Sequence, residues 1–151
     1  VGGGIGVPPL YELAKQFNQR GIKTITILGF NSKDEVFYED EFKKFSETYV
    51  STVDGSVGTK GFVTDVIKKL QEENKLVFDK YYSCGPVPML KALVNAVGED
   101  GYISLENRMA CGIGACYACV CKKKKKDKNK DDYSRVCYDG PVYLASDVEI
   151  E

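Results

Sequence analysis

Four cysteines with a characteristic spacing constrain this 151-residue chain more than any other feature of its sequence. Cys111, Cys116 and Cys119 lie in one short segment, and Cys137 follows after a longer interval. The chain has six cysteines but no histidine, and no segment resembles a secretory signal. Cysteines clustered in this way indicate metal binding or redox chemistry rather than a disulfide framework. The lack of histidine excludes mixed Cys/His zinc sites, a Rieske centre and a histidine general base.

The pattern Cys-x4-Cys-x2-Cys with a distant fourth cysteine is the plant-type ferredoxin spacing, in which one tight loop supplies three thiolates. Small residues between the cysteines let the backbone wrap closely and point its N–H groups at the sulfurs. We therefore predict a [2Fe–2S] cluster on Cys111, Cys116, Cys119 and Cys137. A structural four-cysteine zinc site is the alternative, but such sites usually pair two short Cys hooks, and only one is present.

Cys121 lies two residues after Cys119, on the same face of an extended strand, and could therefore compete as a ligand. We interpret it as a neighbouring buried thiol, because the loop spacing fits without it.

Before Gly98, apolar spacing predicts alternating helices and strands. The expected helices cover 10–19, 39–45, 61–71 and 88–97, and the expected strands cover 24–30, 49–53 and 81–84. This alternation indicates a parallel α/β sheet with right-handed crossovers. The chain opens on a glycine-rich turn that normally follows a buried strand, yet a single Val precedes it. We therefore expect a truncated first strand and a longer parent protein.

The opening turn resembles the dinucleotide-binding fingerprint, with Pro9 in place of the third glycine. Gly3, Gly4 and Gly6 would allow close approach of a pyrophosphate, and the following helix would offer free N–H groups. A plain strand–helix turn is the alternative. In the loop after the second strand, a lysine precedes Asp34 and no arginine is present, which favours NAD over NADP. A solvated turn is the alternative there.

Two further loops are expected at the carboxyl edge of the sheet, where α/β folds bind ligands. Cys84, Gly85 and Pro86 follow a strand and open a helix, although a helix start with a buried cysteine would look the same. Asp54 and Gly55 begin a polar, glycine-containing loop.

After Gly98, glycine and cysteine become frequent, and Lys122–Lys130 forms a basic run between short strands expected at 119–122 and 133–137. We interpret the run as a solvated hairpin tip. The predicted fold class is thus α/β: a parallel-sheet NAD-binding domain over 1–98, followed by a small Cys-rich [2Fe–2S] module over 99–151.

Several motifs occur together in an order that resembles the electron-transfer subunits of NAD-linked dihydroorotate dehydrogenases of pyrimidine synthesis. They are Gly-Gly-Gly-Ile-Gly-Val-Pro-Pro, the segment 54–65, Cys84-Gly85-Pro86, the segment 104–121 and Asp139-Gly140-Pro141-Val142. The resemblance implies a ferredoxin-reductase-like subunit with an FAD-binding barrel, an NAD domain and a cluster module. It also implies a heterotetramer with an FMN-containing catalytic subunit, in which electrons pass from FMN through the cluster and FAD to NAD⁺.

No FAD barrel is recognisable in this sequence, so FAD binding is expected mainly from another part of the protein. The resemblance places Cys84 near the nicotinamide ring, where we assign it orientation rather than nucleophilic attack. The interval between Cys119 and Cys137 is longer than expected for the family. We assign no catalytic residue.

The overall charge of −1 predicts neither nucleic-acid nor anionic-membrane binding. No apolar run approaches the length of a membrane span, so a cytoplasmic protein is expected. Two alternatives stay open: a related ferredoxin- or sulfide-linked reductase subunit, and a zinc module whose basic run docks a partner.

Overall fold

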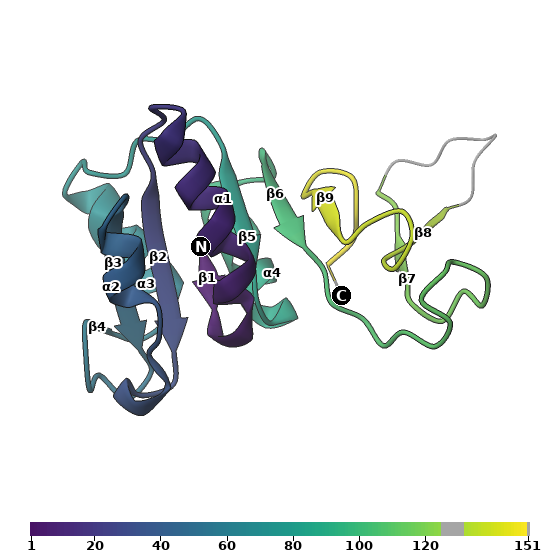
Figure 1. Ribbon diagram of the computed structural model, residues 1–151, viewed down its shortest axis with the longest axis horizontal. Coiled ribbons are helices and arrows are strands. Elements are labelled where there is room, and N and C mark those ends of the chain that lie inside the picture. Colours follow the sequence, from purple (N-terminus) through teal and green to yellow (C-terminus); the bar gives the residue numbers. More distant parts are fainter. Residues whose placement is uncertain (125–131, 151) are drawn as a thin grey trace.

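The computed structural model describes residues 1–124 and 132–150, which form a helix-flanked sheet and a separate two-stranded hairpin (Figure 1). The strands of the sheet are β1 (Gly2–Gly3), β2 (Ile25–Phe30), β3 (Glu47–Thr52), β4 (Thr59–Lys60), β5 (Tyr81–Cys84), β6 (Gly101–Ser104) and β9 (Val142–Leu144). The helices are α1 (Val7–Gln19), α2 (Glu39–Lys43), α3 (Val63–Glu72) and α4 (Val87–Val97), with short turns η1 (Gly4–Gly6) and η2 (Lys33–Glu35). The hairpin pairs β7 (Val120–Lys122) with β8 (Tyr133–Arg135).

The strand order of the sheet, within the described residues, is β4-β3-β2-β1-β5-β6-β9. All neighbouring pairs are parallel except β6 with β9. The chain builds outward from β1 to one side and then returns to build from β5 to the other. The order therefore reverses between β1 and β5, and this switch point is where open α/β sheets bind ligands. The predicted parallel α/β fold is confirmed.

Helices cover both faces of the sheet (Figure 1). Helices α1 and α2 pack on one face, around the fully buried Val7, Leu28 and Phe42. Helices α3 and α4 pack on the other, where α3 presents an apolar stripe and α4 contributes Leu90 and Leu93. Apolar residues at helical spacing thus give each helix one buried side.

The sheet does not end at Gly98. Strands β6 and β9 extend it with residues that we had assigned to the cluster module. The core under α3 and α4 is also continuous with Cys119, Val136 and Val148. The two halves therefore share one core, and the division into domains at residue 98 stays a prediction.

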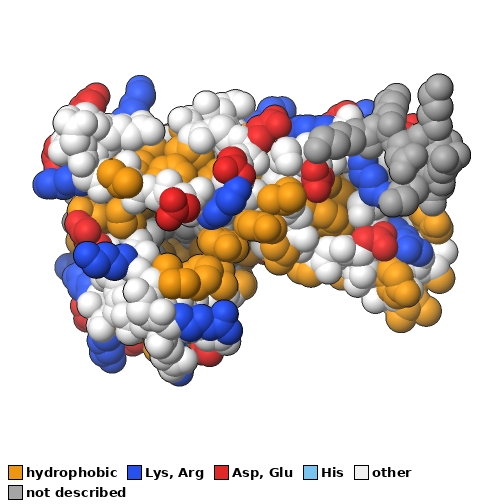
Figure 2. Space-filling view, turned by 90° about the horizontal axis from the view of Figure 1, so that it is seen from above, with side chains coloured by type: hydrophobic (Ala, Val, Ile, Leu, Met, Phe, Trp, Pro, Cys, Tyr) orange, Lys and Arg blue, Asp and Glu red, His pale blue; other side chains and the backbone are white. Residues whose placement is uncertain are grey.

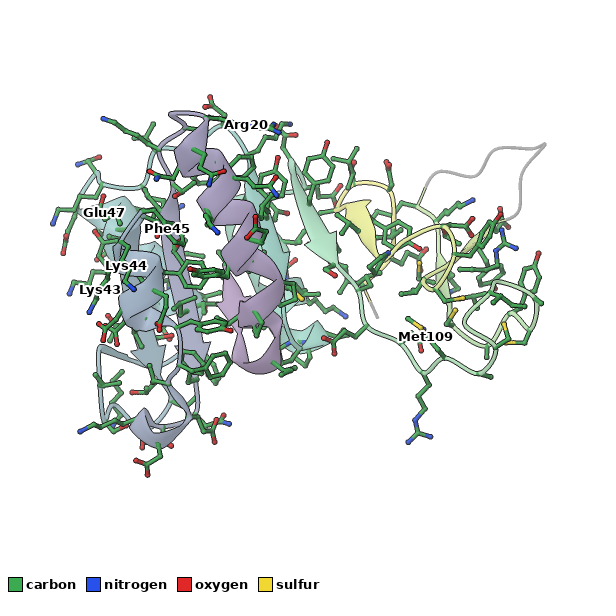
Figure 3. All side chains as sticks on the ribbon, viewed as in Figure 1. Arg20, Lys43, Lys44, Phe45, Glu47 and Met109 are labelled. Carbon is green, nitrogen blue, oxygen red and sulfur yellow. The ribbon has the colours of Figure 1, made fainter. Side chains whose placement is uncertain are left out.

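A groove of about 940 Å³ opens at the amino ends of the strands. It is lined by the starts of β2 and β5, by α1, and by residues around α2 that include Lys44 and Phe45 (Figure 3). In the described chain β1 contributes only two residues, so it pairs with the carboxyl ends of its neighbours alone. This groove lies at the opposite edge of the sheet from the predicted nucleotide loops.

Lys122 lies in β7, Lys123 forms a bridge with Val148, and the Lys124 ammonium contacts the Glu99 carboxylate at 2.7 Å. The rest of the lysine run, from residue 125, lies outside the described residues, so the hairpin-tip interpretation stays a prediction. No helix in the described ranges is long and apolar enough to cross a bilayer.

Candidate cluster and nucleotide sites

The glycine turn after β1 lies against the end of β5. Gly2 pairs with Cys84 in the parallel register. An ideal Cβ on Gly6 would stand 2.2 Å from the Cys84 carbonyl oxygen, and one on Gly3 would stand 2.4 Å from the Met89 sulfur. A side chain at Gly6 would therefore push the two loops apart, whereas one at Gly3 would first displace the Met89 side chain. The structure brings together the two predicted loops around Gly3–Gly6 and Cys84–Pro86.

Two helices begin at this switch point. Helix α1 starts at Val7 with proline in its first turn, and α4 starts at Val87 directly after Pro86. Proline costs little in a first turn, because the N–H groups there have no partner within the helix. The remaining free N–H groups and the positive ends of both helix dipoles suit a bound pyrophosphate.

Cys84 is buried at the end of β5. Burial raises the pKa of its thiol, which a hydrogen bond with Ser104 only partly offsets. The neutral thiol is therefore favoured over the nucleophilic thiolate. This chemistry fits a role in orientation.

The loops that carry Asp34 and Asp54 are joined through Ser56. The Lys33 N–H donates to the Ser56 hydroxyl oxygen at 2.7 Å, and that hydroxyl donates to the Asp54 carboxylate at 2.6 Å. The hydrogen bonds that the Ser56 hydroxyl and N–H donate to Asp54 hold the pKa of its carboxyl below its usual value. Asp34 lies in η2 after β2, and Gly55 follows Asp54 beyond the end of β3. The sequence analysis gave Ser56 no role of its own, because nothing distinguishes it from an ordinary loop serine.

The first two cysteines of the predicted cluster form one pair. The Cys116 N–H donates to the Cys111 sulfur at 3.4 Å. The N–H groups of Ile113 and Cys116, together with the Cys116 thiol, lower the pKa of Cys111 to about 6. The loop backbone therefore stabilises negative charge on this sulfur before any metal is bound.

The hairpin builds the second pair. Cys119 directly precedes β7, Cys137 follows β8, and the Val136 N–H donates to the Cys119 carbonyl. This register carries the Cys137 N–H to 3.4 Å from the Cys119 sulfur and lowers the pKa of that thiol. The shared hydrogen bond with Cys119 raises the pKa of Cys137, because one thiol of the pair keeps its proton.

The two pairs suit two irons better than one metal ion. Each iron of a [2Fe–2S] cluster takes two cysteine sulfurs, so Cys111 with Cys116 and Cys119 with Cys137 would hold one iron each. A zinc site would instead gather four sulfurs around one ion. The donor set fits the cluster, which would supply one-electron redox chemistry.

Cys121 lies in β7 and packs against the core near Tyr143. Burial raises the pKa of its thiol, unlike those of Cys111 and Cys119. The side chain is half-buried rather than buried, and the interpretation of Cys121 as a neighbour of the site, not a ligand, stays a prediction.

Exposed hydrophobic side chains surround the cysteine pairs. Ile113 is 72% exposed and Tyr138 is 65% exposed, and Met109 lies on the irregular segment between β6 and β7 (Figure 3). Figure 2 shows hydrophobic side chains gathered at this end of the molecule. Sequence reasoning did not anticipate this surface, because its residues become neighbours only through the loop and hairpin.

Family models match both halves of the chain. Residues 1–95 match the oxidoreductase NAD-binding domain, and residues 106–149 match the iron-sulfur cluster binding domain of dihydroorotate dehydrogenase B. The solved structure described as "Insights into flavin-based electron bifurcation via the NADH-dependent reduced ferredoxin-NADP oxidoreductase structure" aligns with a TM-score of 0.81 and 33% identity. That alignment covers 99% of this chain and 52% of the other.

Curated relatives carry the name dihydroorotate dehydrogenase B (NAD(+)), electron transfer subunit. The protein of Fusobacterium nucleatum subsp. nucleatum is 93% identical over 151 residues, which are 100% of this chain and 57% of that protein. The protein of Lysinibacillus sphaericus is 59% identical over 144 residues, which are 95% of this chain and 54% of that protein. The chain thus spans about half the length of the curated relatives it matches. By its NAD-binding domain the chain belongs to the family of oxidoreductase NAD-binding domains, and along its whole length it is similar to one part of the dihydroorotate dehydrogenase B electron transfer subunits.

Proposed function

We propose that this chain is the NAD-binding and cluster-binding part of a subunit that transfers electrons between NAD and an FMN-containing dihydroorotate dehydrogenase. The carriers between these two would be one [2Fe–2S] cluster and FAD. A nicotinamide exchanges two electrons as hydride and a cluster one at a time, so a flavin is needed between them. The observation that carries this proposal is the arrangement of the four cysteines as two hydrogen-bonded pairs, in a chain whose sheet also brings together two loops of the nucleotide-binding type.

Each group of residues has a distinct task in this proposal. Cys111, Cys116, Cys119 and Cys137 hold the cluster, and backbone N–H groups of the loop stabilise its negative charge. Gly3, Gly4 and Gly6, together with Cys84, Gly85 and Pro86, receive the dinucleotide at the switch point. Asp34, Asp54 and Gly55 would border its ribose end.

The exposed hydrophobic surface around the cysteine pairs suits a redox partner. Ile113 and Met109 are exposed beside the cysteine loop, where a partner must approach closely to exchange electrons. Hydrophobic patches of this kind mark protein–protein contacts. We propose that the FMN-containing catalytic subunit docks here, within a heterotetramer, and that the complex is cytoplasmic, where six free thiols stay reduced.

Metal analysis of the purified protein tests the central part of this proposal. We expect a red-brown protein with iron and acid-labile sulfide in equal amounts, and a paramagnetic signal after one-electron reduction. Colourless protein with one zinc per chain would instead identify a structural zinc module.

A second candidate is a flavoprotein reductase subunit that serves a different partner. It is favoured by the structural likeness to an NADH-dependent reduced ferredoxin-NADP oxidoreductase. Co-purification from cells with an FMN-containing dihydroorotate dehydrogenase would support the first candidate, and co-purification with another redox protein would support the second.

A further inference from the structure

Arg135, the last residue of β8, connects both halves of the cysteine site. Its guanidinium donates to both carboxylate oxygens of Asp139, at 3.0 and 3.1 Å. The third guanidinium nitrogen donates to the Gly114 carbonyl at 3.0 Å. We call this set of three residues the Arg135 latch.

Two tyrosines enclose the latch. The guanidinium carbon lies 4.6 Å from the ring centre of Tyr138 and 5.5 Å from that of Tyr117. Tyr117 has a left-handed backbone, with φ at 56°, which is costly for a residue with a large side chain. Contact with Arg135 offsets part of that cost and holds the turn between Cys116 and Cys119 in place.

Gly114 is the point where the latch reaches the first cysteine pair. It is buried, although most residues around it in the loop are exposed. Its φ is +80°, and a Cβ there would stand 2.9 Å from the Tyr138 side chain. Tyr138 directly follows Cys137 in the chain, so Gly114 packs beside the second cysteine pair while it belongs to the loop of the first.

We infer that Arg135 is a positioning residue for the cluster, because its latch fixes the Cys111/Cys116 loop against the Cys119/Cys137 hairpin. This inference rests on the proposed cluster. Each cysteine pair is organised by local N–H donors, but two irons bridged by sulfide also require a fixed separation between the pairs. The latch connects the two pairs directly. A bidentate guanidinium–carboxylate contact supplies the geometric rigidity that this task needs.

Removal of groups that orient metal ligands typically weakens metal binding about 10-fold to 100-fold. We therefore expect Arg135→Gln to accelerate release of iron to a chelator by about that factor. Arg135→Lys keeps the charge beside Asp139 but loses the fork, so its release rate should lie between those of the Gln variant and the parent.

The matched control is Arg108→Gln. Arg108 is an exposed arginine on the segment that leads to Cys111, and in the described chain only its backbone N–H has a hydrogen-bond partner, the Asn107 side chain. Both Gln variants remove one positive charge near the cluster, but only Arg135→Gln removes the hydrogen bonds to Asp139 and Gly114. Iron release from Arg108→Gln should match that of the parent.

The experiment uses the full-length electron transfer subunit with its cluster, monitored by chelator-trapped iron, visible circular dichroism and the resonance spectrum of the reduced cluster. Arg135→Gln should change the dichroism and resonance of the cluster that it retains, which a general loss of stability would not do. Equal release rates and equal spectra for Arg135→Gln and Arg108→Gln would overturn the inference.

If Arg135→Gln fails to fold, Asp139→Asn tests the same contact with almost no change in shape. It should accelerate iron release in the same direction, and a parent-like rate would overturn the inference. A parent protein that holds zinc would contradict the proposed function itself. A parent protein that holds an iron–sulfur cluster, whose iron release is unaffected by substitution of Arg135, would contradict only the role of the latch.

Discussion

At the scale of single residues, the four cysteines could be picked out from the sequence, but the Arg135 latch could not. The cysteine spacing singled out four thiols, and the structure shows these four as two hydrogen-bonded pairs, an arrangement that the spacing did not predict. Their assignment as cluster ligands stays a prediction. The sequence could not predict the Arg135 latch, since Arg135 and Asp139 look like an ordinary surface pair four residues apart. Only the turn after β8 directs that pair toward Gly114.

Two cysteine variants test the ligand assignment. Cys116→Ser removes one of two sulfurs from an iron position, so we expect loss of the visible absorbance and of most bound iron and sulfide. Cys121→Ser changes a half-buried thiol outside the four, and it should keep the full cluster. Measurements of iron, sulfide and visible absorbance on both purified proteins show which of the two cysteines is a ligand. A colourless Cys121→Ser protein would show that the ligand assignment is wrong.

Gly6→Ala tests the approach of the glycine turn to β5. The added methyl would stand 2.2 Å from the Cys84 carbonyl oxygen, so the turn must shift. We expect a loss of about 2 kcal/mol in the free energy of unfolding and weaker NADH binding. Gly21→Ala is the control, since its methyl would meet nothing within 4 Å and its cost, from positive φ, is about 1 kcal/mol. Denaturant titration and NADH titration separate the two, and equal NADH affinity in both variants would refute a role for Gly6 in binding.

At the scale of elements, the sequence predicted the helices and strands whose own apolar pattern is clear. Strand β5 was expected at 81–84, as observed, and α4 begins within one residue of its expected start. Strands β6 and β9 were missed, because their antiparallel pairing joins residues that are distant in the sequence. Local patterns contain no register information of that kind. Because β6 and β9 belong to the main sheet, they should stay folded when the cluster is lost.

Loss of the cluster should loosen the cysteine loop but leave the sheet intact. Strands β6 and β9 pair within the main sheet, and Val136 and Val148 are buried in its core, so they need no metal to stay ordered. The segment between β6 and β7 lacks such pairing, and it depends on its ligands. We expect the cluster-free protein to keep its helical circular dichroism and to be cut by protease between residues 105 and 119. Mass spectrometry of the fragments locates the cuts, and first cuts within β6 or β9 would contradict this expectation.

At the scale of the whole molecule, the nucleotide edge and the cysteine pairs lie on opposite sides of β6. The hairpin and cysteine loop extend from the end of the sheet beyond β6 and β9, while the predicted nucleotide loops follow β1, β2, β3 and β5 (Figure 1). The shared core fixes these two regions relative to each other. A rigid arrangement of this kind suits electron transfer, in which the carriers must stay at a constant separation.

The exposed end of the cluster module should therefore determine which partner the protein accepts. Ile113→Asp places a charge in the hydrophobic surface beside the cysteine pairs without removing a ligand. If the FMN-containing subunit docks there, desolvation of the new carboxylate should weaken association at least 10-fold, which corresponds to about 1.4 kcal/mol. The bound cluster should keep its absorbance.

Val53→Asp is the control for this prediction, because Val53 is also exposed but follows β3, near the far edge of the sheet. It should leave association unchanged. Calorimetric titration of each full-length variant with the partner subunit gives the affinities directly. Equal weakening by both substitutions would indicate a general effect of charge or stability, and unchanged binding of Ile113→Asp would move the docking surface away from the cluster. Only a selective loss with Ile113→Asp supports electron entry at this end of the molecule.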